Sequence, residues 1–286
     1  MNADGWVECR CGSRHWGRGG AAGLLLTDGD RVVLQHRAEW SHQGGTWGMP
    51  GGARHTDESA VAGALREAAE EAGVDAERVS AFATSVLVHP DWSYTTVLAR
   101  TDADLHVEPT DAESLEIAWV PIPEVTDRPL LPAFADAWPQ LRSMLAIDLH
   151  VVVDAANVVG SRPDGWWRDR RGATARLIER LDTLAATGIP AAFADLPGDR
   201  WWPTWLVVTE GAARGAAAAA RVATVPAPGS GDDTVVEIAT ELTASGAHVV
   251  VVTADRGLRE RCEGAGGTVV GPRTLLDLLD TLGTLG

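Results

Sequence analysis

The stretch that decides the fold of the first half of the chain is GGARHTDESAVAGALREAAEEAGV, residues 51–74. Two glycines open it, and the alanine-rich run that follows contains one arginine and three glutamates: Arg66, Glu67, Glu70 and Glu71. An α-helix turns by about 100° per residue, so the three glutamates share one face of the predicted helix. The opposite face carries small and apolar side chains, and we expect it to face the core: Val61, Leu65, Ala68 and Ala72.

The ends of this helix and its charge are both informative. Thr56 or Asp57 is the predicted N-cap, and Gly73 suits a left-handed C-cap. Three like charges on one helical face repel each other, and a solvated acidic face is the usual explanation for such a run. A hard divalent cation explains the acids together with Arg66 and the Gly-Gly turn, because Mg²⁺ or Mn²⁺ takes several oxygen ligands and keeps positions for substrate phosphates.

The same residues carry a family resemblance. The pattern G-x5-E-x7-R-E-U-x-E-E-x-G-U of the Nudix box is filled at every specified position: Gly52, Glu58, Arg66, Glu67, Ala68, Glu70, Glu71, Gly73 and Val74. The chain therefore resembles the Nudix hydrolases over its first half. That resemblance implies an α/β/α sandwich with a mixed sheet and a Mg²⁺- or Mn²⁺-dependent hydrolysis of a nucleoside diphosphate linked to another group.

The resemblance also assigns roles to single residues. Glu67, Glu70 and Glu71 would hold the metal, with the backbone carbonyl of Gly51 as a further ligand. Arg66 would orient these acids by charge-assisted hydrogen bonds, and Glu58 would assist. The loop and strands before the helix would line the nucleotide side, which makes Arg37 and Trp47 candidate substrate contacts; a core position for Trp47 is the alternative.

Further along, ESLEIAWVP at residues 113–121 resembles the Nudix segment that precedes the last helix. Glu113 or Glu116 is thus a candidate extra metal ligand or general base, and the alternative is that both are surface glutamates. We expect strands over 21–26, 31–36, 81–88 and 94–100. A last helix over 130–145 is expected despite its two prolines.

Length and composition limit the remaining possibilities. A chain of 286 residues accommodates two domains, which we place at 1–146 and 147–286. We expect no membrane span or signal peptide. Three cysteines do not suggest a disulfide framework, so a reducing cytoplasm is expected. Cys9, Cys11 and His15 suggest zinc, but C-x-C-x3-H is not a standard spacing and a plain terminal segment is the alternative.

In the second half, short apolar strands alternate with helices, which indicates a mostly parallel, Rossmann-like sheet covered on both faces. We expect strands at 149–153, 191–194, 205–208, 248–253 and 268–270. Helices are expected at 172–186, 212–221 and 232–244, and from Leu258 and Thr274 onward. In such a sheet, sites form beyond the carboxyl ends of the strands. The aspartates expected at that edge are Asp154, Asp195, Asp232, Asp233 and Asp255.

The segments VVVDAANVVG, GDDTVVEIA and VVVVTADRGLRER resemble the acidic motifs of PIN-like ribonucleases, especially the NYN group. By that resemblance Asp154, Asn157, Asp232, Asp233 and Asp255 would form a metal pocket, with Asp169 a weaker member. The alternative is a Rossmann-like module whose aspartates serve as helix caps and turn residues.

Arginines and tryptophans lie close together in one part of the second half, which suits single-stranded RNA through phosphate contacts and base stacking; the alternative is a solvated helix start with two packed tryptophans. The members of this cluster are Arg162, Trp166, Trp167, Arg168, Arg170, Arg171 and Arg176. The cluster is notable because the chain has a net charge of −16, which argues against nucleic-acid binding over the whole surface. A rival to enzymatic function treats the first half as a nucleotide sensor that regulates the second. The complete box favours catalysis.

Overall fold

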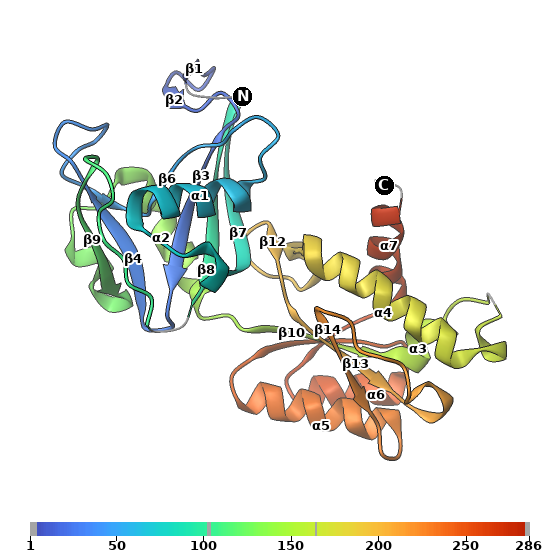
Figure 1. Cartoon of the computed structure of the whole chain (residues 1–286). Helices are drawn as coiled ribbons and strands as arrows, with labels where there is room; N and C mark the ends of the chain where they lie inside the picture. Colours follow the sequence, from blue (N-terminus) through green and yellow to red (C-terminus); the bar gives the residue numbers. More distant parts are fainter. Residues whose placement is uncertain (1–4, 102–103, 164, 284–286) are drawn as a thin grey trace. The chain divides into compact units, whose positions relative to one another are not determined.

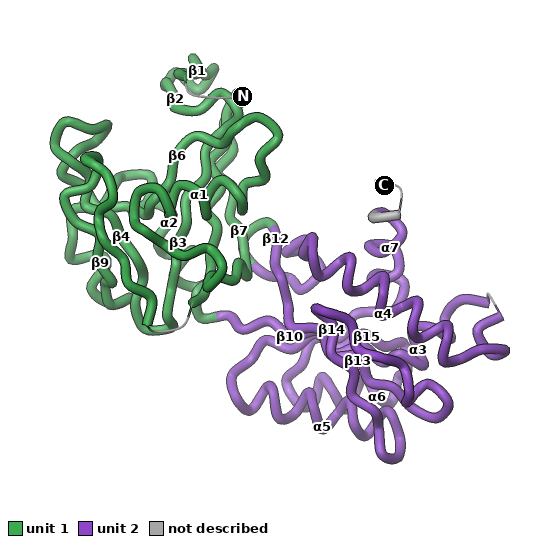
Figure 2. Tube along the Cα trace, viewed as in Figure 1, with its two compact units in different colours: residues 1–146, 197–199 green, residues 147–196, 200–286 purple. Residues whose placement is uncertain are grey.

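The computed structural model describes residues 5–101, 104–163 and 165–283 (Figure 1). The chain divides into two compact units, Met1–Ala146 with Pro197–Asp199, and Ile147–Leu196 with Arg200–Gly286 (Figure 2). Across the described ranges, no helix combines the length and apolar character that crossing a membrane requires.

The first unit is built on a mixed sheet, as expected. At its centre β3 runs parallel to β8 and antiparallel to β4 and β6, while β8 pairs antiparallel with β7 and β4 with β9 and β5. The strands are β3 (Ala21–Thr27), β4 (Arg31–Arg37), β5 (Trp47–Gly48), β6 (Gly51–Ala53), β7 (Ser80–His89), β8 (Trp92–Arg100) and β9 (Ser114–Pro121). Every residue of β3 is buried, so both faces of the sheet are covered around it.

The helix α1 (Ala60–Ala72) carries the acidic face. Its Ala64, Ala68 and Ala72 are fully buried in one cluster with Leu24 and Leu26 of β3. The apolar face predicted from the sequence is therefore the face that packs on the sheet, and the small alanines let the helix lie close to β3.

Three features of the helix ends bear on the sequence predictions. Gly73 caps α1 with φ 64°, as expected. The N-cap is Ser59, whose side chain accepts from the amide of Ala62, rather than Thr56 or Asp57; Asp57 takes φ 70° in the turn before the helix. The last helix, α2 (Pro132–Leu145), starts at Pro132, where a proline costs no hydrogen bond, and continues through Pro139.

Shorter elements complete this unit. An antiparallel hairpin of β1 (Trp6–Glu8) and β2 (Arg14–Trp16) precedes the sheet. Two 3-10 turns follow α1 and β9, namely η1 (Ala76–Arg78) and η2 (Ile122–Asp127).

The second unit has a five-stranded parallel sheet in the order β14-β13-β10-β15-β16. The strands are β10 (Leu149–Asp154), β13 (Thr204–Thr209), β14 (Val222–Pro226), β15 (His248–Val252) and β16 (Thr268–Val270). The helices are α3 (Ala155–Gly160), α4 (Arg170–Thr187), α5 (Gly231–Ala244), α6 (Arg256–Gly264) and α7 (Pro272–Gly283). Figure 1 shows α5 and α6 on one side of this sheet and α4 and α7 on the other.

Two elements of this unit differ from those that the sequence predicted. Residues 191–194 form a 3-10 turn, η4 (Ala191–Phe193), and the residues before it form β11 (Ile189–Pro190), which pairs antiparallel with β12 (Arg200–Trp201) outside the parallel sheet. The alanine-rich run 212–221 forms only the 3-10 turn η5 (Gly211–Ala213). Both runs consist mainly of alanine, which offers no apolar face large enough to stabilise a short element.

Candidate active site

Arg66 is the centre of the acidic face of α1. Its Nε and Nη2 donate to the two carboxylate oxygens of Glu58 at 3.0 and 3.1 Å, and its Nη1 donates to Glu67 at 2.8 Å and to Glu70 at 3.0 Å. Nη2 also donates to the carbonyl of Ala53 at 2.9 Å. The planar guanidinium thus fixes three carboxylates and the turn before the helix in one arrangement.

Glu58 is held from two sides. The Arg66 hydrogen bonds lower its pKa, and the backbone amide of His55 donates to its Oε2 at 2.9 Å. Glu58 is therefore ionised in the folded chain and serves as the anionic partner of Arg66.

Glu67 lies directly against the backbone at Gly52. A Cβ atom at position 52 would lie 2.6 Å from Glu67 Oε2, so a side chain there would displace the carboxylate. Burial raises the pKa of Glu67, and the bond from Arg66 opposes that rise. The glycine of the box is required here by close approach.

Glu71 is the most buried of the acids, with 7% of its surface exposed. Its Oε2 accepts from the amide of Gly51 at 2.9 Å. Burial raises its pKa to about 8, and the charges of Glu67 and Asp111 add to the rise. Gly51 itself has no room for a side chain, because a Cβ would lie 2.5 Å from the Cα of Gly23.

Two residues from outside the Nudix box interact electrostatically with Glu71. Tyr94 on β8 extends its hydroxyl over Gly23, where a Cβ atom would lie 2.0 Å from it. The pKa of Tyr94 is raised by burial first and then by the charge of Glu71. Asp111 is the second, since its charge acts on Glu71. Nothing in the spacing of the chain identifies either residue, because both come from outside the box.

Arg37 belongs to the same surroundings. Its charge lowers the pKa of both Glu71 and Tyr94, and its Nη1 donates to Gln35 Oε1 at 3.4 Å. Gln35 is fully buried and donates to Ser114 Oγ at 2.9 Å. A cation close to the acids suits the substrate contact expected of Arg37.

Three other residues were expected near the site: Trp47, Glu113 and Glu116. Trp47 is 7% exposed, with His36 stacked on its ring at 4.8 Å and the Arg128 guanidinium over the ring at 5.1 Å, so it packs in the core. Glu113 and Glu116 are both exposed, and Glu116 lies opposite His36 in the register of β9 and β4. Asp111, just before the segment 113–121, is an acid whose charge raises the pKa of Glu71.

The donor set suits a hard divalent cation. It consists of carboxylate oxygens, and the raised pKa of Glu71 shows that burial and the charges of Glu67 and Asp111 outweigh the charge of Arg37, an imbalance that a bound cation would offset. The carboxylates are not gathered as tightly as ligands around one ion: among the described residues, the group of three or more metal-binding side chains that lies within 4.8 Å is Cys9, Cys11 and His15.

The second unit also brings acidic residues together at the carboxyl edge of its sheet. Asp154 ends β10 and is buried, and it accepts from Thr253 Oγ1 at 3.0 Å and from the amide of Asn157 at 3.1 Å. Asn157 Oδ1 in turn accepts from the amide of Ala254 at 2.7 Å. Burial raises the pKa of Asp154, with the charges of Asp232 and Glu210 adding to the rise.

The carboxylates of Asp232 and Glu210 interact electrostatically with each other and with Asp154. Burial raises the pKa of Asp232, followed by the charges of Asp255 and Glu210. Glu210, which follows β13, was not expected from the sequence; it accepts from the amide of Gly231 at 2.9 Å. Asp233 instead pairs with Arg261 at 2.7 Å, and Asp195 lies outside the sheet with φ 52°.

Several of these acids also cap helices. Asp154, Asp169 and Asp255 accept from the third residue after them at the starts of α3, α4 and α6. In the arginine cluster, Arg162 pairs with Asp280, while Arg170 lies 5.3 Å over the ring of Trp166. Trp167 and Arg168 are exposed, as base stacking by Trp167 and phosphate contact by Arg168 require.

Comparisons with known proteins agree with the geometry of the first unit. The model of the NUDIX domain matches residues 17–144. Over 153 residues the chain is 49% identical to the putative 8-oxo-dGTP diphosphatase 3 of Mycobacterium tuberculosis, covering 50% of this chain and 70% of that protein. It is 47% identical over 151 residues to a nucleoside triphosphate pyrophosphatase/Nudix hydrolase fusion protein of Bifidobacterium longum, covering 50% of this chain and 31% of that protein.

Among solved structures, the Nudix hydrolase RenU of M. smegmatis is 44% identical, with a TM-score of 0.46, and the match covers 50% of this chain and 95% of RenU. With the domain match, the identity to the mycobacterial relative and the complete box held around Arg66, the chain belongs to the Nudix family of pyrophosphohydrolases.

Proposed function

We propose that the N-terminal domain hydrolyses the diphosphate bond of a nucleoside diphosphate derivative. The observation that carries this proposal is the arrangement of Arg66, which holds Glu58, Glu67 and Glu70 while Glu71 is fixed on the amide of Gly51. Because a relative that is 49% identical is named a putative 8-oxo-dGTP diphosphatase, an oxidised purine nucleoside triphosphate is the first substrate to test.

Glu67, Glu70, Glu71 and the carbonyl of Gly51 would hold Mg²⁺ or Mn²⁺. Such a cation would neutralise charge on the diphosphate and would lower the pKa of a water molecule, so that its deprotonated form can attack phosphorus. Glu70 is the most open of the three carboxylates, with 60% of its side chain exposed, which suits a group that must reach substrate or solvent.

The other side chains position and shield the reaction. Arg66 holds the carboxylates of Glu58, Glu67 and Glu70 in fixed positions, so that they need not rearrange during turnover. Arg37 places a positive charge near Glu71, where the phosphates of a nucleotide would lie. The Tyr94 hydroxyl fills the space over Gly23 and keeps water away from that side of Glu71.

The test is a steady-state assay of the full chain with Mg²⁺ against a panel of 8-oxo-dGTP, sugar nucleotides, ADP-ribose and dinucleoside polyphosphates. Glu70→Gln and Glu71→Gln should lose turnover while the fold is retained. Glu77→Gln, an exposed glutamate in η1 outside the box, is the matched control. Wild-type rates in both box variants would refute the proposal, and tight nucleotide binding without phosphate release would favour a sensor.

As a second candidate function, we propose that the C-terminal unit is a metal-dependent endoribonuclease of the PIN-like kind. The supporting observation is that Asp154, Glu210, Asp232 and Asp255 influence one another at the carboxyl edge of a parallel sheet. Two such acids with pKa values raised by burial and by neighbouring acids are a pattern found at Mg²⁺-dependent sites.

Cleavage of a labelled single-stranded RNA with Mg²⁺ or Mn²⁺ tests this second function. Asp232→Asn and Asp255→Asn should abolish cleavage, and Asp169→Asn, which changes a helix cap outside the group, should retain it. Arg168→Ala and Arg170→Ala should weaken RNA binding if the cluster tracks the strand. Metal-dependent cleavage that survives both acid substitutions would rule out this site.

A further inference from the structure

The hairpin in front of the Nudix sheet gathers three metal-binding side chains. Cys9 and Cys11 lie in the turn between β1 and β2, and His15 lies on β2. Their ligand atoms all lie within 4.8 Å of one another, with Cys11 Sγ and His15 Nε2 3.2 Å apart. In tetrahedral zinc sites the metal lies about 2.3 Å from sulfur and about 2.0 Å from nitrogen, which separates ligand atoms by distances of this order.

The turn is shaped to hold its sulfur atoms together. The Cys9 amide donates to the carbonyl of Ser13 at 3.1 Å, and the Gly12 amide donates to the carbonyl of Cys9 at 2.9 Å, with Gly12 at φ 90°. This tight turn brings the two sulfur atoms within 4.8 Å of each other and of the His15 ring nitrogen.

His15 is held in a fixed orientation on the domain. Its ring stacks on Trp92 at 4.4 Å with 12° between the planes, and it lies 4.4 Å from the ring of His89. These ring contacts hold the imidazole beside the two cysteines.

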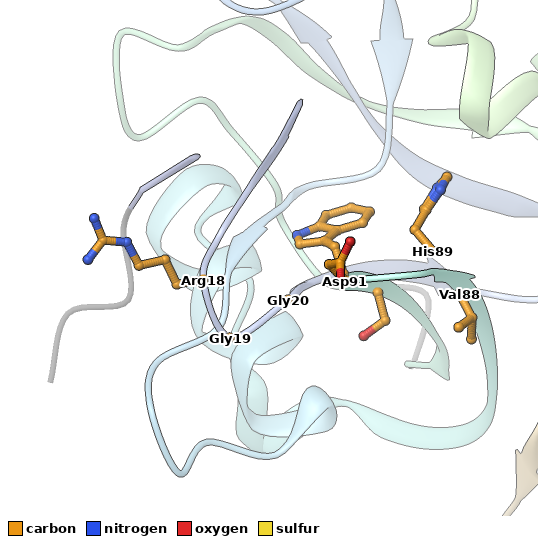
Figure 3. A pocket seen from close by; sticks show the side chains of 8 residues that line it. Arg18, Gly19, Gly20, Val88, His89 and Asp91 are labelled. Atoms are coloured by element: carbon orange, nitrogen blue, oxygen red, sulfur yellow. The ribbon is translucent and has the colours of Figure 1, made fainter. Parts of the chain in front are cut away.

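A carboxylate completes the surroundings. Asp91, in the turn between β7 and β8, accepts from the Arg10 amide at 2.8 Å and from Arg10 Nε at 2.9 Å, and it also contacts the Cys9 thiol. Figure 3 shows Asp91 and His89 at a shallow hollow that Arg18 also lines. Asp91 is therefore an oxygen donor beside Cys9 that can fill a fourth position.

We propose that Cys9, Cys11 and His15 form a zinc site, which with Asp91 as the fourth ligand fastens the β1–β2 hairpin to the β7–β8 turn. Two thiolates and an imidazole are soft and borderline ligands that select Zn²⁺ over the Mg²⁺ of an all-oxygen site. Binding of one Zn²⁺ forms two metal–sulfur bonds, one metal–nitrogen bond and one metal–oxygen bond to Asp91, and it releases the two thiol protons to solvent. The site is separate from the Nudix carboxylates, since it shares no ligand with them.

Metal titration of the full chain in a non-thiol reductant tests the site. Excess Mg²⁺ is included so that carboxylate sites are occupied. Zinc should bind with one equivalent per chain, and Co²⁺ in its place should give a thiolate charge-transfer band, which carboxylates cannot produce. Cys11→Ser and His15→Ala should each weaken zinc binding by on the order of 100-fold and remove the band.

The control is Cys262→Ser, which changes the buried cysteine of the second unit and should leave zinc affinity and the band unchanged. Cys11 is exposed, so its substitution leaves the core intact, and near-ultraviolet circular dichroism verifies the fold. Zinc should also slow trypsin cleavage after Arg10 and Arg14 in the wild type but not in His15→Ala. A wild-type chain without a cobalt–thiolate band, or a band that persists in both hairpin variants, would overturn the site.

Discussion

The amide of Gly51 donates to the carboxylate of Glu71 at 2.9 Å, and this bond joins the strand β6 to the helix α1 at the most buried acid of the Nudix box. Glu71 is desolvated, yet it has one backbone donor and two acidic neighbours, Glu67 and Asp111. The free energy of unfolding therefore depends on the protonation of Glu71 and on cation binding beside it.

The first prediction concerns pH and metal-free stability. The pKa of Glu71 is about 8 in the folded chain, above its ordinary value of 4.5. The folded state binds the proton more tightly than the unfolded state, so this stabilisation is complete below about pH 4.5 and is lost as pH rises toward 8. We expect the free energy of unfolding in chelator to fall by on the order of 1 kcal/mol per pH unit in this window.

Denaturant unfolding of the wild type and of Glu71→Gln at several pH values measures this effect, because their difference isolates Glu71 from the other titrating groups. Glutamine cannot ionise, so the variant should lack that part of the pH dependence. Mg²⁺ should restore stability to the wild type at the alkaline end. Parallel pH profiles for the two proteins would contradict the assignment.

The second prediction concerns Arg66→Lys. Lysine keeps the positive charge, but its three N–H groups lie on one nitrogen and cannot span Glu58, Glu67 and Glu70 as the planar guanidinium does. We expect kcat to fall by about 10- to 100-fold and half-saturation by Mg²⁺ to need a higher concentration. Kinetics with varied Mg²⁺ test this, with Arg78→Lys on the surface turn η1 as control. An unchanged metal dependence would show that charge alone suffices.

The third prediction concerns Gly52→Ala. The added Cβ would lie 2.6 Å from Glu67 Oε2, and the carboxylate, being the end of a flexible chain, can move away. Turnover should therefore drop by at least about 10-fold, while the melting temperature changes little. Gly48→Ala, whose added Cβ meets Leu131 at an ordinary 3.7 Å, should keep its activity. Equal rates in the two variants would mean that the position of Glu67 does not limit turnover.

The fourth prediction concerns Glu210, which joins the acidic group of the second unit. Glutamine at this position can still accept from the amide of Gly231 but carries no charge. Glu210→Gln should reduce metal-dependent RNA cleavage by about 100-fold or more while the fold persists. Glu237→Gln in the middle of α5 is the matched control. If the Glu210 variant cleaves as fast as the control, the residue only supports the loop.

Much of the first unit could be predicted because its signals are local. The alternation of acidic and apolar positions places α1 on the sheet by its alanine face, and Gly73 ends it in the left-handed conformation. The strand predicted at 191–194 and the helix predicted at 212–221 were wrong for the opposite reason. Alanine runs have no strong period and little apolar surface, so tertiary contacts decide their conformation.

The sequence by itself determined the Nudix box and its helix, because those features depend on residue types at fixed spacing, and the mixed sheet followed from the family resemblance that the box carries. Only the tertiary structure decided that Tyr94, Asp111 and Arg37 surround Glu71, that Trp47 packs in the core, and that Glu210 joins Asp154 and Asp232. These residues come from separate strands and loops. Their proximity depends on how the sheets pair and pack, which no local pattern records.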